Sequence, residues 1–212
     1  MVVLIRNLQK RIVLNIPLIL QNANTLVDIL RINHFDVNLV FVGKGFIKSL
    51  NLRYRRRNVT TDVLAFPYLQ VRSSKRKGSF FLVVTIKFSN LPKPGVLPQM
   101  PLKPHEYTLG DIVLGTHKIT EDCESDGIEL DTYLPVIITH GLCHLLGYTH
   151  ETQDELDKVG KISYCSTLVF SRQLPQCVLI MRNKEVEVLK EFNGRTGFNS
   201  VPVTPEKVEL FR

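Results

Sequence analysis

The stretch Leu134-Pro-Val-Ile-Ile-Thr-His140-Gly-Leu-Cys-His144-Leu-Leu146 contains no aspartate, glutamate, lysine or arginine. It is apolar nearly all round, which predicts a central helix that the rest of a folded domain buries. Asp131 or Thr132 can cap its start, and Pro135 suits a first helical turn. Gly147 follows directly and predicts the end of the helix, because glycine readily adopts the left-handed conformation.

The sequence on both sides of this helix contains strand-like and helix-like segments in mixed order. Alternating or β-branched residues predict strands at residues 2–5, 36–42, 63–66 and 111–114. Apolar residues at helical spacing predict further helices at residues 17–32, from residue 45 onward, and at 181–192. The order lacks strict strand–helix–strand alternation. We therefore expect an α+β domain with a small mixed sheet around the buried helix.

Length and composition limit the class of protein. The 212 residues suit one domain that is long enough to bury a core. A hydrophobic share of 44% and a charged share of 22% exclude wholesale disorder. No apolar run reaches the ~18 residues of a membrane helix, so we expect no membrane partner. The four cysteines form no CxxC pair, which disfavours a disulfide framework or a thiolate zinc finger and favours a reducing compartment.

Three of the chain's six histidines lie close together at the end of the uncharged helix. His140 and His144 are four residues apart and share one helix face, where two imidazoles can bind one ion. Two such histidines are also compatible with ordinary core side chains. His150 follows the glycine turn and can return as a third ligand, and burying three imidazoles without a partner is costly. We therefore predict one Zn²⁺ per chain, with one coordination position open as in catalytic zinc sites.

The spacing His-x-x-x-His-x-x-Gly-x-x-His is also that of a class of zinc peptidases. Those enzymes carry a glutamate directly after the first histidine, where it acts as general base. Gly141 occupies that position here, which disfavours peptide hydrolysis. Glu151 and Asp154 are the nearest carboxylates in sequence that can substitute. A zinc metallopeptidase therefore stays as the alternative enzyme class.

Several blocks of the chain together resemble the YbeY family of rRNA-maturation endoribonucleases. The segment His140–His150 reads HGLCHLLGYTH, similar to the family pattern HGxLHLxGYDH. Leu50–Arg55 and Thr61–Pro67 resemble the pattern N-x-x-YR…TDVLSFP, and Leu109–Ile112 matches a third block. The blocks occur in the family's order. Thr149 replaces the aspartate that is usual in bacteria, which makes the chain most similar to vertebrate members.

The resemblance implies an α+β fold with a buried, zincin-like metal helix. It implies that zinc is bound by His140, His144 and His150, and that Arg55 is a functional, catalytic arginine. The implied substrate is single-stranded RNA, chiefly ribosomal RNA, with the ribosome or ribosomal proteins as partners. A non-catalytic module that binds RNA or the ribosome is a third interpretation, because the sequence between the histidines and the C-terminal helix departs from the family pattern.

The arginines near Arg55 suit RNA cleavage. The planar guanidinium of Arg55 can neutralise a phosphate oxygen, and a zinc ion can polarise a phosphoryl group. Arg53, Arg56 and Arg57 can hold flanking phosphates, or they can form an ordinary solvated helix end. Either zinc-activated water or the RNA 2′-hydroxyl can serve as the nucleophile.

Two segments look inserted into a single domain of residues 1–197, and residues 198–212 look like a C-terminal tail. The segments, residues 71–90 and 160–180, contain seven cations and no acid, which equals the net charge of +7. The balanced remainder gives no global nucleic-acid signal. The second segment predicts a helix that ends near Val159 and restarts near Met181, with Pro175 in the interruption. Both are retained intron sequence or genuine surface loops.

The start of the chain bears on the compartment. No acid precedes Asp28, while Arg6, Lys10 and Arg11 are basic, as in an organelle transit segment. The same residues also begin with a strand-like run, so an unremoved first strand is favoured over a cleaved presequence. We expect an intracellular protein. The resemblance to eukaryotic members favours mitochondria, with the nucleus and cytosol as alternatives.

Overall fold

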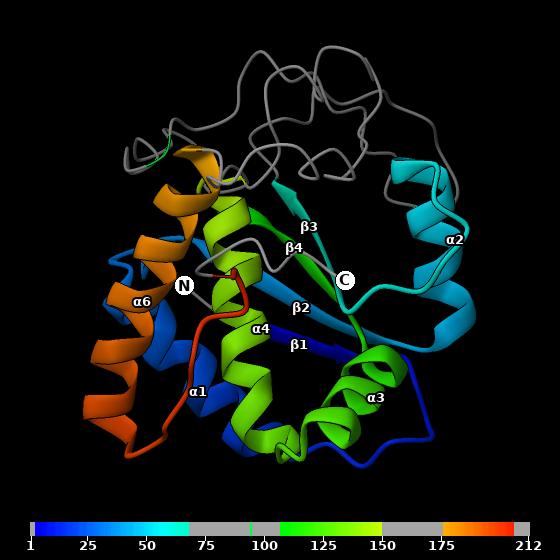
Figure 1. The fold of residues 1–212 in the computed structure, drawn as a ribbon, viewed down its shortest axis with the longest axis horizontal. Coiled ribbons are helices and arrows are strands. Elements are labelled where there is room, and N and C mark those ends of the chain that lie inside the picture. Colours follow the sequence, from blue (N-terminus) through cyan, green and yellow to red (C-terminus); the bar gives the residue numbers. More distant parts are fainter. Residues whose placement is uncertain (1–2, 68–93, 95–106, 150–175, 206–212) are drawn as a thin grey trace, which may run out of the picture.

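The structure, a computed structural model, describes residues 3–67, 94, 107–149 and 176–205. In these residues helices surround one sheet (Figure 1). The elements in chain order are β1 (Val3–Asn7), α1 (Ile16–Ile29), β2 (Asp36–Val42), α2 (Lys44–Arg55), β3 (Val63–Pro67), β4 (Thr108–Gly115), α3 (Thr116–Asp126), α4 (Leu130–Leu145) and α6 (Gln176–Thr196).

The four strands form a mixed sheet in the order β1-β2-β4-β3. β1, β2 and β4 run parallel, and β3 pairs antiparallel with β4. Ile112 on β4 is central, because it lies opposite Leu39 of β2 on one side and Ala65 of β3 on the other. The α+β class with a small mixed sheet, predicted from the sequence, is confirmed.

The two faces of the sheet carry different helices. Ile112 belongs to the large core cluster, which also contains buried residues of α1, α4 and α6. The next residue, Val113, belongs to a smaller cluster with Ile47 of α2, since successive side chains of a strand point to opposite faces. Figure 1 shows α4 crossing the sheet, with α1 and α6 beside it. The histidine helix is thus held between the sheet and two other helices.

Helix α4 is the predicted central helix, and 11 of its 16 residues are buried. It begins at Leu130, four residues before the apolar run starts. The amides of Thr132 and Tyr133 both bond to the Glu129 carbonyl, at 3.0 Å each, and close a first turn that is mostly polar. Pro135 is therefore inside the helix and not in its first turn. The expected cap at residue 131 or 132 is wrong, because both residues are already helical.

Two other helices differ from the sequence prediction. α3 was not predicted, because its segment is mostly polar and only Thr116, Ile119 and Cys123 are buried. α6 begins at Gln176, so the last residues of the predicted insert 160–180 are helical, and Val178 among them is 3% exposed. The insert at 71–90, residues 160–175 and the helix end near residue 159 lie outside the described residues.

The segment after α6 lies against the domain, although the sequence predicts a tail from residue 198. The Phe198 ring stacks on Phe192 of α6, with centroids 5.7 Å apart. Asn193 binds the backbone of Ser200 twice, donating to its carbonyl at 2.9 Å and accepting from its amide at 3.0 Å. Residues 198–205 therefore form part of the packed structure, and residues 206–212 lie outside the described ones.

Candidate metal centre

The structure brings two of the three predicted histidine ligands together. His140 and His144 lie on one face of α4, as their spacing predicts, and their Nε2 atoms are 3.1 Å apart. The rings meet edge to face, with centroids 4.6 Å apart and an angle of 89° between the planes. Nε2 is the ring nitrogen farther from the backbone. The Nδ1 atom of each ring is therefore available to bond to a different group.

The turn after α4 orients His144. Gly147 has φ +85°, the left-handed conformation that the sequence predicts for the end of the helix. Its amide bonds to the His144 carbonyl, and the Tyr148 amide bonds to the Cys143 carbonyl, both at 3.0 Å. This is the hydrogen-bond pattern of a Schellman turn. It places the Tyr148 carbonyl 3.0 Å from His144 Nδ1, and since a carbonyl only accepts, Nδ1 carries the proton.

A carboxylate orients His140. Glu185 on α6 is 1% exposed, and its Oε1 atom lies 2.7 Å from His140 Nδ1. An ionised carboxylate only accepts hydrogen bonds, so His140 also carries its proton on Nδ1. Sequence reasoning missed Glu185, which is 45 positions away from its partner. The signal was an acid on the apolar face of α6, in helical register with Met181 and Val188.

The two rings therefore approach each other through their unprotonated nitrogens. With both protons on Nδ1, neither neutral ring can donate to the other across 3.1 Å. A cation shared by the two nitrogens, or a proton on one of them, makes such a contact favourable. Adjacent nitrogens on a tetrahedral zinc with bonds of ~2.0–2.1 Å lie roughly 3.3–3.4 Å apart, close to this spacing. Metal-binding histidines also characteristically donate Nδ1–H to a carboxylate or a carbonyl. The pair fits two metal ligands.

No third candidate ligand joins the pair among the described residues. Within residues 3–67, 107–149 and 176–205, no three His, Cys, Asp or Glu side chains are grouped so as to hold a metal. Glu185 bonds to the far side of His140 and does not face the space between the rings' Nε2 atoms. The predicted ligand His150 comes directly after Thr149 and lies outside the described part of the chain. Glu151 and Asp154 also lie outside it.

Gly141 and Cys143, between the two histidines, pack into the core. Cys143 is 0% exposed, and burial raises the pKa of its thiol, so it stays protonated and packs as an apolar side chain. Gly141 faces the sheet, where a Cβ atom would lie 2.8 Å from Ile112 Cγ2. The position that holds a glutamate in zinc peptidases is thus occupied by a residue that packs α4 onto β4.

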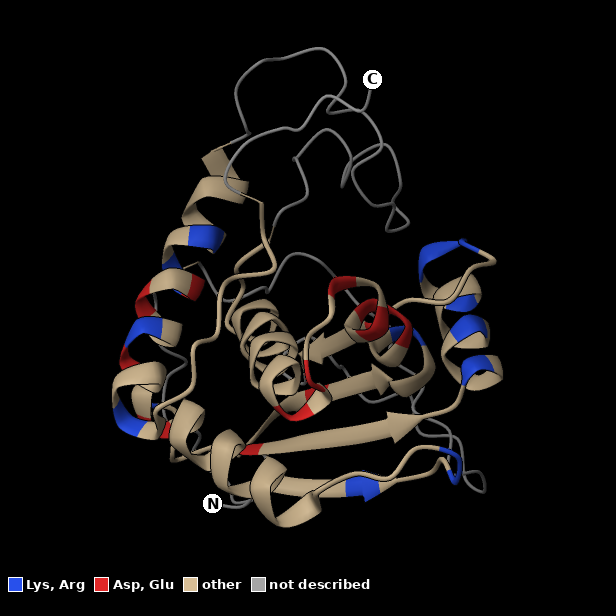
Figure 2. Ribbon diagram, turned by 60° about the horizontal axis from the view of Figure 1, so that its bottom comes forward, with Lys and Arg blue, Asp and Glu red and all other residues tan. Residues whose placement is uncertain are grey.

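The predicted arginines lie at the end of α2. Arg55 is the last helical residue and is half-buried, while Arg56 follows in the left-handed conformation with φ +58°. Arg53 and Arg56 are exposed, and Arg57 is half-buried. α2 contains no acidic residue, and Figure 2 shows its lysines and arginines along its length. The arrangement presents positive charge at one helix end, as phosphate binding requires.

The arginine end of α2 and the histidine end of α4 approach the same part of the sheet. Tyr54 packs edge to face on Phe66 of β3, with centroids 5.2 Å apart. At Gly110 of β4, a Cβ atom would lie 2.4 Å from the Phe66 carbonyl and 2.8 Å from Leu145 of α4. The C-terminal ends of α2, β3 and α4 accordingly lie at one end of the molecule (Figure 1).

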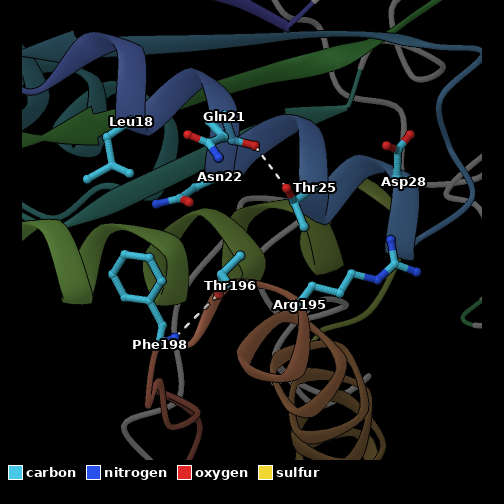
Figure 3. Close-up of a pocket in the computed structure, with 8 residues that line it drawn as sticks. All are labelled: Leu18, Gln21, Asn22, Thr25, Asp28, Arg195, Thr196 and Phe198. Atoms are coloured by element: carbon cyan, nitrogen blue, oxygen red, sulfur yellow. Dashed lines mark hydrogen bonds between the residues drawn. The ribbon is translucent and has the colours of Figure 1, made fainter.

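A pocket of about 350 Å³ lies between α1 and the end of α6 (Figure 3). Its lining contains none of the residues predicted for the site. The lining residues are Leu18, Gln21, Asn22, Thr25, Asp28, Arg195, Thr196 and Phe198. The candidate chemistry is therefore at the histidine pair and not in this pocket.

A family model and several named relatives point to one family. A family model described as Endoribonuclease YbeY matches residues 5–163. A human protein named Endoribonuclease YbeY is 33% identical over 204 residues, which cover 96% of this chain and 96% of the human one. A protein of that name from Caldicellulosiruptor bescii is 28% identical over 63% of this chain and 72% of its own. The solution structure of TM1509 from Thermotoga maritima covers 95% of this chain and 100% of its own, at 20% identity and a TM-score of 0.44.

Proposed function

This chain belongs to the endoribonuclease YbeY family, and we propose that it is a zinc-dependent endoribonuclease that cleaves single-stranded RNA during ribosomal RNA maturation. The name of the matching family supports the nuclease activity. The observation that supports metal dependence is the contact between His140 Nε2 and His144 Nε2 at 3.1 Å, with both Nδ1 atoms already bonded. One cation can be shared by two unprotonated nitrogens at this distance.

We propose that His140, His144 and His150 bind one Zn²⁺ per chain. When bound, zinc polarises a phosphoryl oxygen and makes water a stronger acid. The residues of the chain itself hold the ring orientations: Glu185 accepts from His140, and the Tyr148 carbonyl accepts from His144. Both rings are thus set before any ion enters, which lowers the ordering cost of binding.

The arginines of α2 are proposed to act on the RNA backbone. Residues 44–57, which form α2 and the start of the loop after it, contain six cations and no acid, so they attract phosphates. Arg55 is half-buried, whereas Arg53 and Arg56 are exposed, and the Arg53 guanidinium lies over the Tyr54 ring, 5.7 Å from its centroid. We assign Arg55 to the scissile phosphate, where a planar fork can bind two oxygens. We assign Arg53, Arg56 and Arg57 to flanking phosphates.

We propose ribosomal RNA and the ribosome or its proteins as partners. We propose an intracellular location, with mitochondria favoured over the nucleus and cytosol. None of the helices in the described ranges is long and apolar enough to cross a bilayer. Strand β1 (Val3–Asn7) is an edge strand that pairs with β2. Cleavage of a presequence within or after β1 would therefore remove a strand from the sheet. Cell fractionation with sequencing of the N-terminus tests the compartment and the retention of β1 together.

One experiment separates nuclease, peptidase and non-catalytic RNA-binding protein. Zinc content and cleavage of a single-stranded RNA and of a peptide are measured on the same preparation of the full chain. We expect about one zinc and RNA cleavage in the wild type, and loss of both in His144→Ala. His34→Ala is the control, because His34 is an exposed histidine on the loop between α1 and β2. Full zinc occupancy in His144→Ala would refute the metal assignment, and RNA binding without cleavage would favour the non-catalytic protein.

A further inference from the structure

The C-terminal segment reaches the metal centre through Glu185. The carboxylate accepts three hydrogen bonds, of which one comes from His140 and two come from Thr204. Oε1 accepts from His140 Nδ1 at 2.7 Å and from the Thr204 hydroxyl at 2.9 Å. Oε2 accepts from the Thr204 amide at 3.1 Å. Thr204 lies in the segment that the sequence predicts to be a tail, and it is 3% exposed.

We propose that Thr204 is a positioning residue that fixes the Glu185 carboxylate, and through it His140, so that docking of residues 198–204 sets the metal affinity of the site. The inference rests on the proposed function, because it concerns the same metal centre. It adds a part of the chain that lies outside residues 5–163, the range that the family model matches.

Burial makes these hydrogen bonds necessary. Glu185 is 1% exposed, so water does not replace a bond that its carboxylate loses. A buried charge without partners is strongly unfavourable, whereas one that accepts several hydrogen bonds is tolerated. Without Thr204, Glu185 would retain only the bond to His140 among the three described here. The carboxylate would then be free to rotate about its last side-chain bonds and to carry the His140 ring with it.

Residues 198–204 bond to α6 near both ends of the segment, which holds Thr204 in place. At its start, Asn193 of α6 makes two hydrogen bonds to the backbone of Ser200, and Phe198 stacks on Phe192. At its end, the guanidinium of Arg182 donates to the Thr204 carbonyl. Arg182 and Glu185 lie about one turn apart on α6, so two side chains of the same helix bond to Thr204. The position of residues 198–204 therefore acts directly on the position of the Glu185 carboxylate.

The test compares zinc affinity, measured by chelator competition, and the ligand-field spectrum of the Co²⁺ form across folded full-length variants. Thr204→Val keeps the size and the amide but removes the hydroxyl, and we expect zinc binding to weaken by roughly 3–10-fold, below the ~10–100-fold typical for direct partners of a metal ligand. Thr204→Ser should restore wild-type affinity. Glu185→Gln should weaken binding more, by roughly 10–100-fold, because its NH₂ group would face the donors that the carboxylate now accepts from.

A matched control separates positioning from general stability. Thr120→Val makes the same chemical change on α3, where the hydroxyl donates to the Thr116 carbonyl at 2.9 Å, within its own helix and apart from residues 198–204. It should leave zinc affinity and the Co²⁺ spectrum unchanged. If Glu185→Gln does not fold, the Thr204 pair and this control still decide the matter.

The outcomes distinguish this proposal from the proposed function. A wild-type chain that binds no zinc, or a His144→Ala variant that keeps it, would overturn both. Normal zinc binding in the wild type together with unchanged affinity and spectrum in Thr204→Val would overturn only the role of Thr204. An equal loss of affinity in Thr204→Val and Thr120→Val would also overturn it, since the effect would then be one of stability.

Discussion

Gly141 of α4 lies directly on Ile112 of β4: a Cβ atom at residue 141 would be 2.8 Å from Ile112 Cγ2 and 3.1 Å from Cδ1. At this residue, the helix that carries both histidines therefore meets the sheet through its bare backbone. Ile112 is 0% exposed and central in the sheet, so it has little space to move. The missing glutamate of the peptidase motif thus has a packing reason, in addition to its chemical consequence.

Gly141→Ala should lower the free energy of unfolding. Overpacking a core costs ~1–3 kcal/mol, which exceeds the ~1 kcal/mol that alanine gains over glycine inside a helix. Urea denaturation of the full chain measures the difference. Gly194→Ala is the matched control, because Gly194 is helical and has nothing within 4 Å of its Cβ position. It should stabilise the protein, and a stabilising Gly141→Ala would contradict the close packing.

Gly147→Ala should weaken both stability and zinc binding. Alanine in the left-handed conformation costs ~1–2 kcal/mol, and relaxation of the turn would move the Tyr148 carbonyl away from His144. Gly127→Ala is the control, since Gly127 ends α3 with φ +64° and has the same backbone requirement. Its stability should fall by a similar amount while zinc affinity stays normal. If Gly147→Ala binds zinc as tightly as Gly127→Ala does, the turn at residue 147 does not influence the metal centre.

Arg55→Ala should strongly reduce RNA cleavage and leave zinc content unchanged, because we assign Arg55 to phosphate and not to metal. Single-turnover cleavage and metal analysis on one preparation test this. Arg56→Ala removes the neighbouring charge, and we expect it mainly to lower the salt dependence of RNA binding by about one phosphate contact. Normal turnover in Arg55→Ala would remove that residue from the mechanism.

Cys123 should resist alkylation more than Cys177. Burial, together with nearby Asp122 and Asp126, raises the pKa of the Cys123 thiol, so its reactive thiolate forms only at higher pH. Cys177 is half-buried at the start of α6. Mass spectrometry of peptides after brief iodoacetamide treatment at pH 8 compares the two rates, which should become similar once the protein is denatured. Faster labelling of Cys123 in the native state would contradict its buried position.

The sequence by itself determined the features that depend on local pattern. An uncharged apolar run predicted the buried helix α4, alternation predicted strand β2 with its observed bounds, and a glycine predicted the left-handed turn at residue 147. The spacing of four residues placed His140 and His144 on one face. Each of these follows from the periodicity of a helix or strand, which neighbouring residues encode directly.

Only the tertiary structure decided how these elements meet. Glu185 reaches His140 across 45 positions, and Thr204 reaches Glu185 from a segment with no helical or strand pattern. The role of Gly141 appears only when Ile112 lies against it. Such relationships depend on which faces pack together and how closely. A hydrogen bond between distant residues requires positions set to a few tenths of an ångström, and local periodicity carries no information at that scale.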